Sequence, residues 1–299
     1  MQNGTKGAAE MKNLNIPVGV SDFAEIRKNG YYYIDKSGLI GDILGTTGTK
    51  VTLITRPRRF GKTLGMSMLE NFFDVRKDSK ALFEGLEIAQ RQDLCNEWMN
   101  QWPVVFLSLK NVDGLSFSDA YQQLVYEIAL LYQEHDYLLE SEALDDQEKF
   151  IVRQLRDRQA GKTDVMRAIQ LLTRLLNRYY NKKVILLIDE YDVPVAKANS
   201  HGYYNEMLDV MKGLMQALKD NQSLRFAVIT GCLKIAKESI FTGTNNFVSD
   251  TITDSRLNEY FGFVQSEVNQ ILKDADAEEN ADSIKQWYDG YHFGNFDVY

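Results

Sequence analysis

The chain has 299 residues, of which 44% are hydrophobic and 25% charged, as is ordinary for a folded globular protein. This length allows one large domain or two modest ones, with a substantial core. The formal net charge of −8 at pH 7 argues against a protein that coats nucleic acid or an anionic membrane surface.

Cysteine and histidine usage argues against a disulfide framework and a transition-metal site. The two cysteines, Cys95 and Cys232, lie far apart and belong to no Cys-x-x-Cys motif, which fits a reducing compartment. The three histidines show no ligand spacing. The polar N-terminus contains no apolar segment typical of a secretory signal, and the apolar stretches are too short to cross a bilayer. We therefore expect a cytoplasmic protein without a membrane partner.

From residue 51 onward, the chain alternates between strand and helix patterns, which is typical of a mostly parallel sheet covered by helices. The β-branched run 51–55 predicts a buried strand, and apolar residues at helical spacing predict a helix from Lys62 to about Asp74. Four further strands are predicted at residues 104–109, 184–188, 225–230 and 246–253. The sequence therefore predicts an α/β fold with a five-stranded, mostly parallel sheet.

The domain organisation follows from the same patterns. Residues 1–14 are expected to form a flexible N-terminus, and residues 15–254 an α/β domain. Residues 255–299 are expected to form a small, mainly helical C-terminal subdomain. Near its end, residues 287–294 form a dense cluster of aromatic residues and glycines, for which we favour aromatic packing around a tight turn.

The segment between the first predicted strand and helix has the pattern of a phosphate loop, or Walker A motif. It reads Arg56, Pro57, Arg58, Arg59, Phe60, Gly61, Lys62 and Thr63, followed by Leu64. Backbone N–H groups at a helix N-terminus attract phosphate, so we expect these residues to bind a nucleotide. Lys62 is expected to reach the β- and γ-phosphates and also to assist catalysis, and the Thr63 hydroxyl to bind Mg²⁺.

One position departs from the usual motif, which is GxxxxGK[ST]. Arg56 occupies the place of the first glycine. With Arg58 and Arg59 it adds three positive charges to the loop. These arginines could clamp phosphate, contact an acidic partner or be solvated.

The apolar run 184–188 ends in two carboxylates, as a Walker B strand does. In a parallel sheet, ligands gather at the carboxyl ends of the strands, so Asp189 and Glu190 should face the phosphate loop. We expect Asp189 to hold Mg²⁺ and Glu190 to act as the general base towards the attacking water. The alternative is a pair of acids in an exposed turn. Asp192 is expected to support the turn rather than to catalyse.

Thr230, at the end of the fourth predicted strand, is a candidate to sense the γ-phosphate or the attacking water; the alternative is a simple strand cap. Lys234, Arg256, Arg58 and Arg59 are candidates to stabilise charge in the transition state. No guanine-reading NKxD motif follows the acidic strand, which favours adenine.

Five segments together resemble the bacterial AAA-ATPase-like family. They are residues 16–19, 33–36, 56–63, 188–192 and 287–291. The resemblance covers about residues 14–299, and the arginine-rich loop is itself typical of this family. It implies a P-loop fold with an additional strand between the two Walker strands, ATP binding and a helical lid formed by residues 255–299.

Members of this family commonly continue into a PD-(D/E)xK nuclease-like domain. The present sequence stops just after residues 287–291, so no nuclease activity is expected from it. A nucleic-acid partner is expected only if such a domain is present. A homo-oligomer or a protein partner is compatible with the sequence.

The leading interpretation is therefore a Mg²⁺-dependent ATPase. The alternative is a nucleotide-gated signalling or binding switch with negligible hydrolysis. Glu190 favours the first, and the absence of an unambiguous arginine finger leaves room for the second. A small-molecule kinase would need an acceptor pocket and a pair of lid arginines, for which the sequence has no signature.

Overall fold

The computed structural model describes residues 14–46, 48–233, 240–241, 246–283, 290–294 and 296–299. Its centre is a sheet of five strands: β1 (Val51–Thr55), β2 (Val104–Ser108), β3 (Val184–Asp189), β4 (Leu224–Gly231) and β5 (Phe247–Asp250). The strands lie in the order β2-β3-β4-β1-β5, and every neighbouring pair is parallel. The predicted fold class is therefore confirmed, including the strand that separates the two Walker strands.

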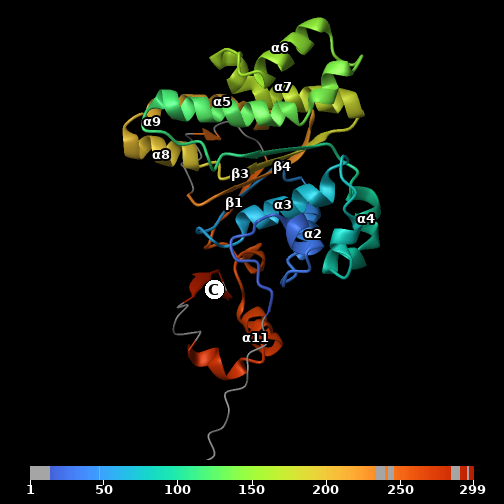
Figure 1. Cartoon of the computed structure of the whole chain (residues 1–299), viewed down its shortest axis with the longest axis vertical. Coiled ribbons are helices and arrows are strands. Elements are labelled where there is room, and N and C mark those ends of the chain that lie inside the picture. The colour runs from blue at the N-terminus through green and yellow to red at the C-terminus, as the bar shows by residue number, and fades with distance from the viewer. Residues whose placement is uncertain (1–13, 47, 234–239, 242–245, 284–289, 295) are drawn as a thin grey trace, which may run out of the picture.

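Helices cover both faces of the sheet (Figure 1). One face carries α5 (Phe117–Gln133), α6 (Asp146–Arg156), α7 (Lys162–Tyr180), α8 (Val193–His201) and α9 (Tyr204–Leu214). The other carries α1 (Phe23–Lys28), α2 (Gly38–Gly45), α3 (Lys62–Phe73) and α4 (Gln92–Trp98). Short 3₁₀ turns occur at Lys80–Phe83, Glu87–Gln90, Asp136–Glu140, Met215–Leu218, Asn258–Tyr260 and Glu278–Asn280. In the described residues, no helix is both long and apolar enough to cross a membrane.

Strand β3 shows why the strands appear in the sequence as continuous apolar runs. Val184, Leu186 and Ile188 pack with the helices α5–α9, whereas Ile185 and Leu187 pack with α1–α4. All five side chains are fully buried. A parallel sheet between two helical layers buries both faces, so neither face requires polar residues.

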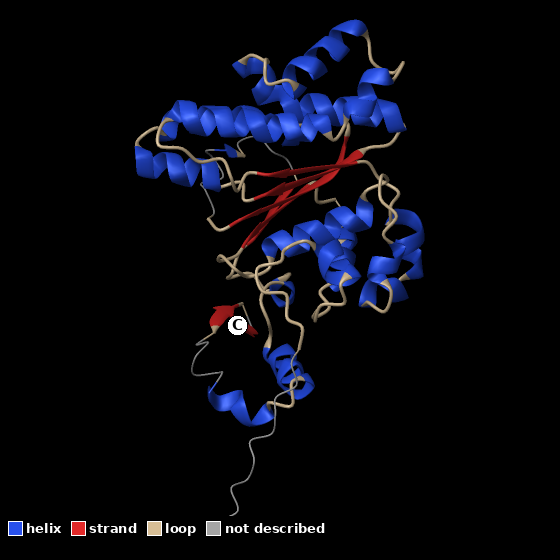
Figure 2. Ribbon diagram, viewed as in Figure 1, coloured by secondary structure: helices blue, strands red, loops and turns tan. Residues whose placement is uncertain are grey.

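The described residues of the C-terminal segment, 255–283, 290–294 and 296–299, lie beyond the α3 face of the sheet (Figures 1 and 2). It contains α11 (Gln265–Asp274) and an antiparallel hairpin of β6 (Tyr291–Phe293) and β7 (Phe296–Val298). The prediction of helix is thus confirmed for α11, but it did not include the hairpin. Residues 287–289 of the aromatic cluster and 1–13 of the predicted flexible N-terminus lie outside the described residues.

Candidate functional site

The phosphate loop connects the carboxyl end of β1 to the first turn of α3. The backbone N–H of Arg56 donates to the carbonyl oxygen of Gly231 (3.1 Å), so the loop leaves the sheet beside the end of β4. Gly61 has a φ of 75°, a left-handed conformation that glycine adopts without a Cβ penalty. Helix α3 then begins at Lys62, so its first N–H groups face the loop, with Leu64 partly buried in the first turn. This is the strand–loop–helix arrangement that phosphate binding requires.

The ammonium group of Lys62 is buried among neutral acceptors. The residue is only 5% exposed, and its Nζ donates to the carbonyl oxygens of Arg56 (3.1 Å) and Pro57 (2.9 Å) and to Cys232 Sγ (3.3 Å). Within the described part of the chain, no carboxylate forms an ion pair with it. Burying a charge without a direct ion-pair partner is unfavourable. The site therefore favours an anion near Lys62.

Three of the predicted site residues meet at the carboxyl edge of the sheet. The hydroxyl of Thr63 donates to Asp189 Oδ2 (2.8 Å), and the hydroxyl of Thr230 donates to Asp189 Oδ1. Asp189 is fully buried at the end of β3, and Thr230 lies near the end of the neighbouring β4. Helix α3 and strands β3 and β4 thus bring together residues that are up to 167 positions apart in the chain (63 to 230).

Glu190 follows β3 in a half-buried position. Its φ of 53° is unusual for a residue with a Cβ, and such conformations concentrate at functional sites. Burial, and next the charge of Asp189, raise the pKa of Glu190, whereas the charges of Lys62 and Arg58 lower it. Glu190 therefore lies within electrostatic range of Lys62 and of the loop, at the carboxyl edge of the sheet.

Asp192 and Cys232 complete the environment of Lys62. The Asp192 carboxylate accepts hydrogen bonds from the backbone N–H groups of Cys232 (3.1 Å) and Leu233 (2.8 Å), and so holds the turn after β4. Burial raises the pKa of Asp192, and these amide contacts oppose that rise. The contact of Cys232 with Lys62 was not predicted from the sequence. The only indication was that Cys232 follows Thr230 by two residues.

The structure corrects the prediction for the side chain of Arg56. Its guanidinium is fully buried and does not reach towards the N-terminus of α3; it donates to the backbone oxygen of Asp250, the last residue of β5, and to the side chain of Asn258. None of the three sequence-based alternatives (phosphate clamp, acidic partner, solvation) describes it. The partners lie about 200 residues away in the chain, so no local pattern could have indicated them.

The remaining candidates for stabilising charge in the transition state differ in exposure and in the contacts of their side chains. Arg58 and Arg59 are exposed on the loop. Arg256 forms an ion pair with Asp250, which commits its guanidinium to the turn after β5. Lys234 lies outside the described residues. Among the described candidates, Arg58 and Arg59 are therefore the side chains able to turn towards a phosphate.

The oxygen atoms of Thr63 and Asp189 fit a magnesium ion by their chemistry. Mg²⁺ prefers hard oxygen ligands, and protein sites commonly supply only one or two of them beside phosphate and water. In the part of the chain that the structure describes, no cluster of three or more His, Cys, Asp or Glu side chains could hold a metal ion on its own.

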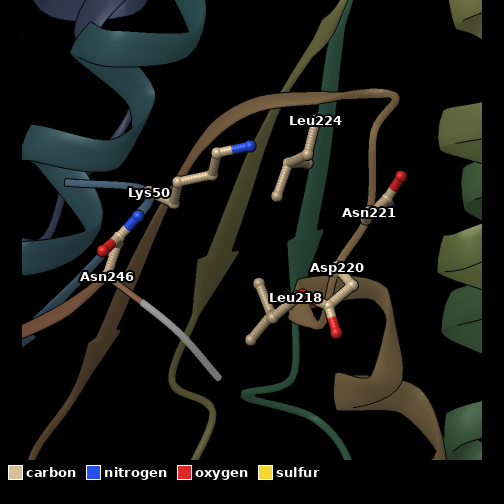
Figure 3. Close-up of a pocket in the computed structure, with 6 residues that line it drawn as sticks. All are labelled: Lys50, Leu218, Asp220, Asn221, Leu224 and Asn246. Carbon is tan, nitrogen blue, oxygen red and sulfur yellow. The ribbon is translucent and has the colours of Figure 1, made fainter. Parts of the chain in front are cut away.

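A cavity of about 240 Å³ lies at the opposite edge of the sheet (Figure 3). It is lined by Lys50, Leu218, Asp220, Asn221, Leu224 and Asn246. Lys50 precedes β1 and Leu224 begins β4, so the cavity lies at the amino ends of these strands. Ligands of open α/β sheets bind at the carboxyl ends. The cavity contains none of the predicted site residues.

Comparison with known proteins agrees with this arrangement. The model of a family described as "Predicted AAA-ATPase" matches residues 17–241, which is more than half of the chain. A protein of Azotobacter chroococcum mcd 1, described as an uncharacterized protein in the vnfD 5′ region, is 30% identical over 292 residues. The match covers 97% of this chain and 51% of that protein, so the chain spans about half the length of this relative. The chain belongs to the AAA-ATPase-like family.

Proposed function

We propose that this chain binds ATP with Mg²⁺ at the phosphate loop and hydrolyses it. The observation that carries the proposal is the buried ammonium of Lys62, whose hydrogen-bond partners among the described residues are all neutral and which lies one residue from the Thr63–Asp189 contact. A triphosphate would supply the missing negative charge, and magnesium the positive charge that Asp189 lacks.

Each residue then has a defined role. Lys62 exchanges its contacts with the carbonyl oxygens of Arg56 and Pro57 for the oxygens of the β- and γ-phosphates. Thr63 and Asp189 would hold Mg²⁺, which when bound neutralises charge on the phosphate oxygens. Backbone N–H groups at the start of α3 bind phosphate through their partial positive charge.

Glu190 is the proposed general base and Thr230 an orienting residue. Glu190 accepts a proton from the water that attacks the γ-phosphate, and its raised pKa makes it a better base. The hydroxyl of Thr230 bonds to Asp189 and so fixes the orientation of that carboxylate. The exposed arginines Arg58 and Arg59 are the candidates for stabilising negative charge as it develops.

We also infer that the base is adenine and that the protein is cytoplasmic. The absence of a guanine-reading NKxD motif supports the first. Two free cysteines, Cys95 and Cys232, support a reducing compartment. We further propose that ATP turnover is coupled to a homo-oligomer or to a protein partner.

Calorimetric titration with Mg·ATP tests the proposal. The wild type should bind, and Lys62→Ala should weaken binding by at least about 100-fold, because it removes a charge-assisted contact to phosphate. Lys50→Ala, which removes a lysine at the cavity on the opposite edge, should leave the affinity unchanged. Equal affinities of wild type and Lys62→Ala would show that the loop is misassigned. Binding without turnover would instead favour the nucleotide-gated switch.

A further inference from the structure

The side chain of Arg56 is built into the C-terminal part of the molecule, although its backbone opens the phosphate loop. Its Nη1 donates to the backbone oxygen of Asp250 (2.9 Å), and its Nη2 donates to Asn258 Oδ1 (2.7 Å). Further hydrogen bonds reach the backbone oxygens of Thr55 (2.9 Å) and Arg256 (3.3 Å). The guanidinium thus connects the start of the loop to chain about 200 residues later.

Two aromatic rings cover the same guanidinium. Its Cζ lies 5.4 Å from the ring centroid of Phe261 and 5.8 Å from that of Phe293, within the range of cation–π contacts. Burial lowers the pKa of Arg56 to about 10, and the charges of Asp250 and Asp254 oppose that decrease. The group therefore stays protonated at neutral pH. Its Nη1 and Nη2 groups donate to four acceptors, whereas the buried Nε has no hydrogen-bond partner among the described residues. A lysine ammonium cannot reproduce this planar arrangement of donors.

The other end of the loop contacts the same segment. The carbonyl oxygen of Phe60 accepts a hydrogen bond from the backbone N–H of Gly262 (3.2 Å). The ring of Phe60 packs against the rings of Tyr291 and Phe293, and its centroid lies 5.2 Å from each of theirs. At Gly262 the φ is 81°, and a Cβ would lie 2.6 Å from Phe60 Cδ1. Only glycine allows this approach. The loop is therefore held at both Arg56 and Phe60.

The anchored backbone is also the surface on which Lys62 rests. The ammonium of Lys62 donates to the carbonyl oxygens of Arg56 and Pro57, the first two residues of the loop. A shift of Arg56 would move these acceptors and the path of the loop towards Gly61. The position of the guanidinium thus affects the place where phosphate would bind.

We propose that Arg56 is a positioning residue that couples nucleotide binding to the docking of the C-terminal segment. Where other phosphate loops have a flexible glycine, this loop has a side chain anchored on residues 250–262 and on Phe293. Coupling of this kind is reciprocal: the docked segment strengthens nucleotide binding, and bound nucleotide stabilises the docked segment. The inference rests on the proposed nucleotide-binding function.

The first test compares two substitutions that each remove a cation bound to the C-terminal segment. Arg56→Met should weaken Mg·ATP binding about tenfold or more, and Arg56→Lys should not restore it, because a single ammonium cannot replace the planar donors. Lys36 is the matched control, since its ammonium binds Glu267 on α11 (2.6 Å) and not the loop. Lys36→Met should keep the affinity within about twofold of the wild type.

The second test measures amide hydrogen exchange with and without Mg·ATP. In the wild type, nucleotide should slow the exchange of the N–H groups of Gly262 and Phe263; in Arg56→Met it should not, even at saturation. Unchanged exchange in the wild type would overturn the inference even if the variant failed to fold. Wild-type affinity in a folded Arg56→Met would overturn it too. A wild type that binds no Mg·ATP would instead overturn the proposed function.

Discussion

The two ends of helix α3 both carry a buried charge, but among the described residues only the charge at the C-terminal end has an ion-pair partner. At the first residue, Lys62 donates to neutral acceptors. At the C-cap, Asp74 is fully buried and forms an ion pair with Arg76 (2.7 Å), whose backbone N–H also donates to the carboxylate (2.9 Å). Each charge is unfavourable with respect to the helix dipole. The difference indicates that Asp74 is structural, whereas Lys62 is suited to an external anion.

This comparison also separates burial from function. Asp189 near the start of α3 is as buried as Asp74, yet it accepts its hydrogen bonds from the hydroxyl groups of Thr63 and Thr230. Groups that are buried and left without an opposite charge reduce stability, and proteins keep them where function requires them. The carboxyl edge of the sheet carries buried charges of this kind, at Lys62 and Asp189. The cavity at the amino edge is lined by neither residue.

The largest expected effect concerns catalysis at the carboxyl edge. Glu190→Gln should lower ATP turnover about 1,000-fold, because it removes the general base, and should leave Mg·ATP affinity within a few-fold. Glu134→Gln, an isosteric change just after α5, is the control and should keep full turnover. Phosphate release and calorimetry measure the two quantities. If the wild type turns over ATP no faster than Glu190→Gln, the carboxyl edge binds nucleotide without catalysis by Glu190.

The next effect concerns stability at the other end of α3. Arg76→Met should lower the free energy of unfolding by about 3 kcal/mol, because it leaves Asp74 buried without its partner. Lys62→Met should not lower it, since this change removes a buried charge that forms no ion pair with the residues the structure describes. Denaturant titration compares the two. A loss in Lys62→Met equal to that in Arg76→Met would break the distinction between the two ends.

A smaller effect is expected for Thr230. Thr230→Val removes the hydroxyl that donates to Asp189 and should reduce turnover about tenfold, as expected for one hydrogen bond to a charged group. Thr230→Ser retains the donor and should restore most of the rate. If valine and serine variants turn over ATP equally, the hydroxyl only caps the strand.

The smallest effect is a pH dependence of the free energy of unfolding that arises from His135, which lies near Arg76 and Asp74. Burial, and next the charge of Arg76, lower the pKa of His135 from 6.5 to about 4. Below pH 6.5 the unfolded chain therefore binds a proton that the folded chain does not, so stability falls as the pH falls. His135 should contribute about 1 kcal/mol of this loss between pH 6.5 and 5.5. The free energy of unfolding of His135→Phe should therefore fall less between pH 6.5 and 5.5 than that of the wild type. An equal fall in both proteins would show that His135 is not buried as a neutral group.

Much of the fold could be predicted because parallel strands are long apolar runs. The bounds of β1 match the prediction, and β3 extends it by one residue to Asp189. The meeting of Thr63 with Asp189 followed from the rule that parallel strands end at one edge. The place of β4 between β1 and β3 came from the family resemblance, since no local pattern fixes the order of strands.

What could not be predicted depends on contacts between distant segments. The strands β6 and β7 have three residues each, too few for an alternating pattern to stand out among aromatic residues and glycines. The burial of Arg56 depends on acceptors 194 to 202 residues away. A substituted glycine in a motif shows that the loop differs, but not where the new side chain lies.

A crystal structure with Mg²⁺ and a non-hydrolysable ATP analogue tests the central claim most directly. We expect Lys62 Nζ to have left the carbonyl oxygens of Arg56 and Pro57 for oxygens of the β- and γ-phosphates, with Arg56 still buried against Asn258. An analogue bound elsewhere, with Lys62 still on those carbonyl oxygens, would contradict the account.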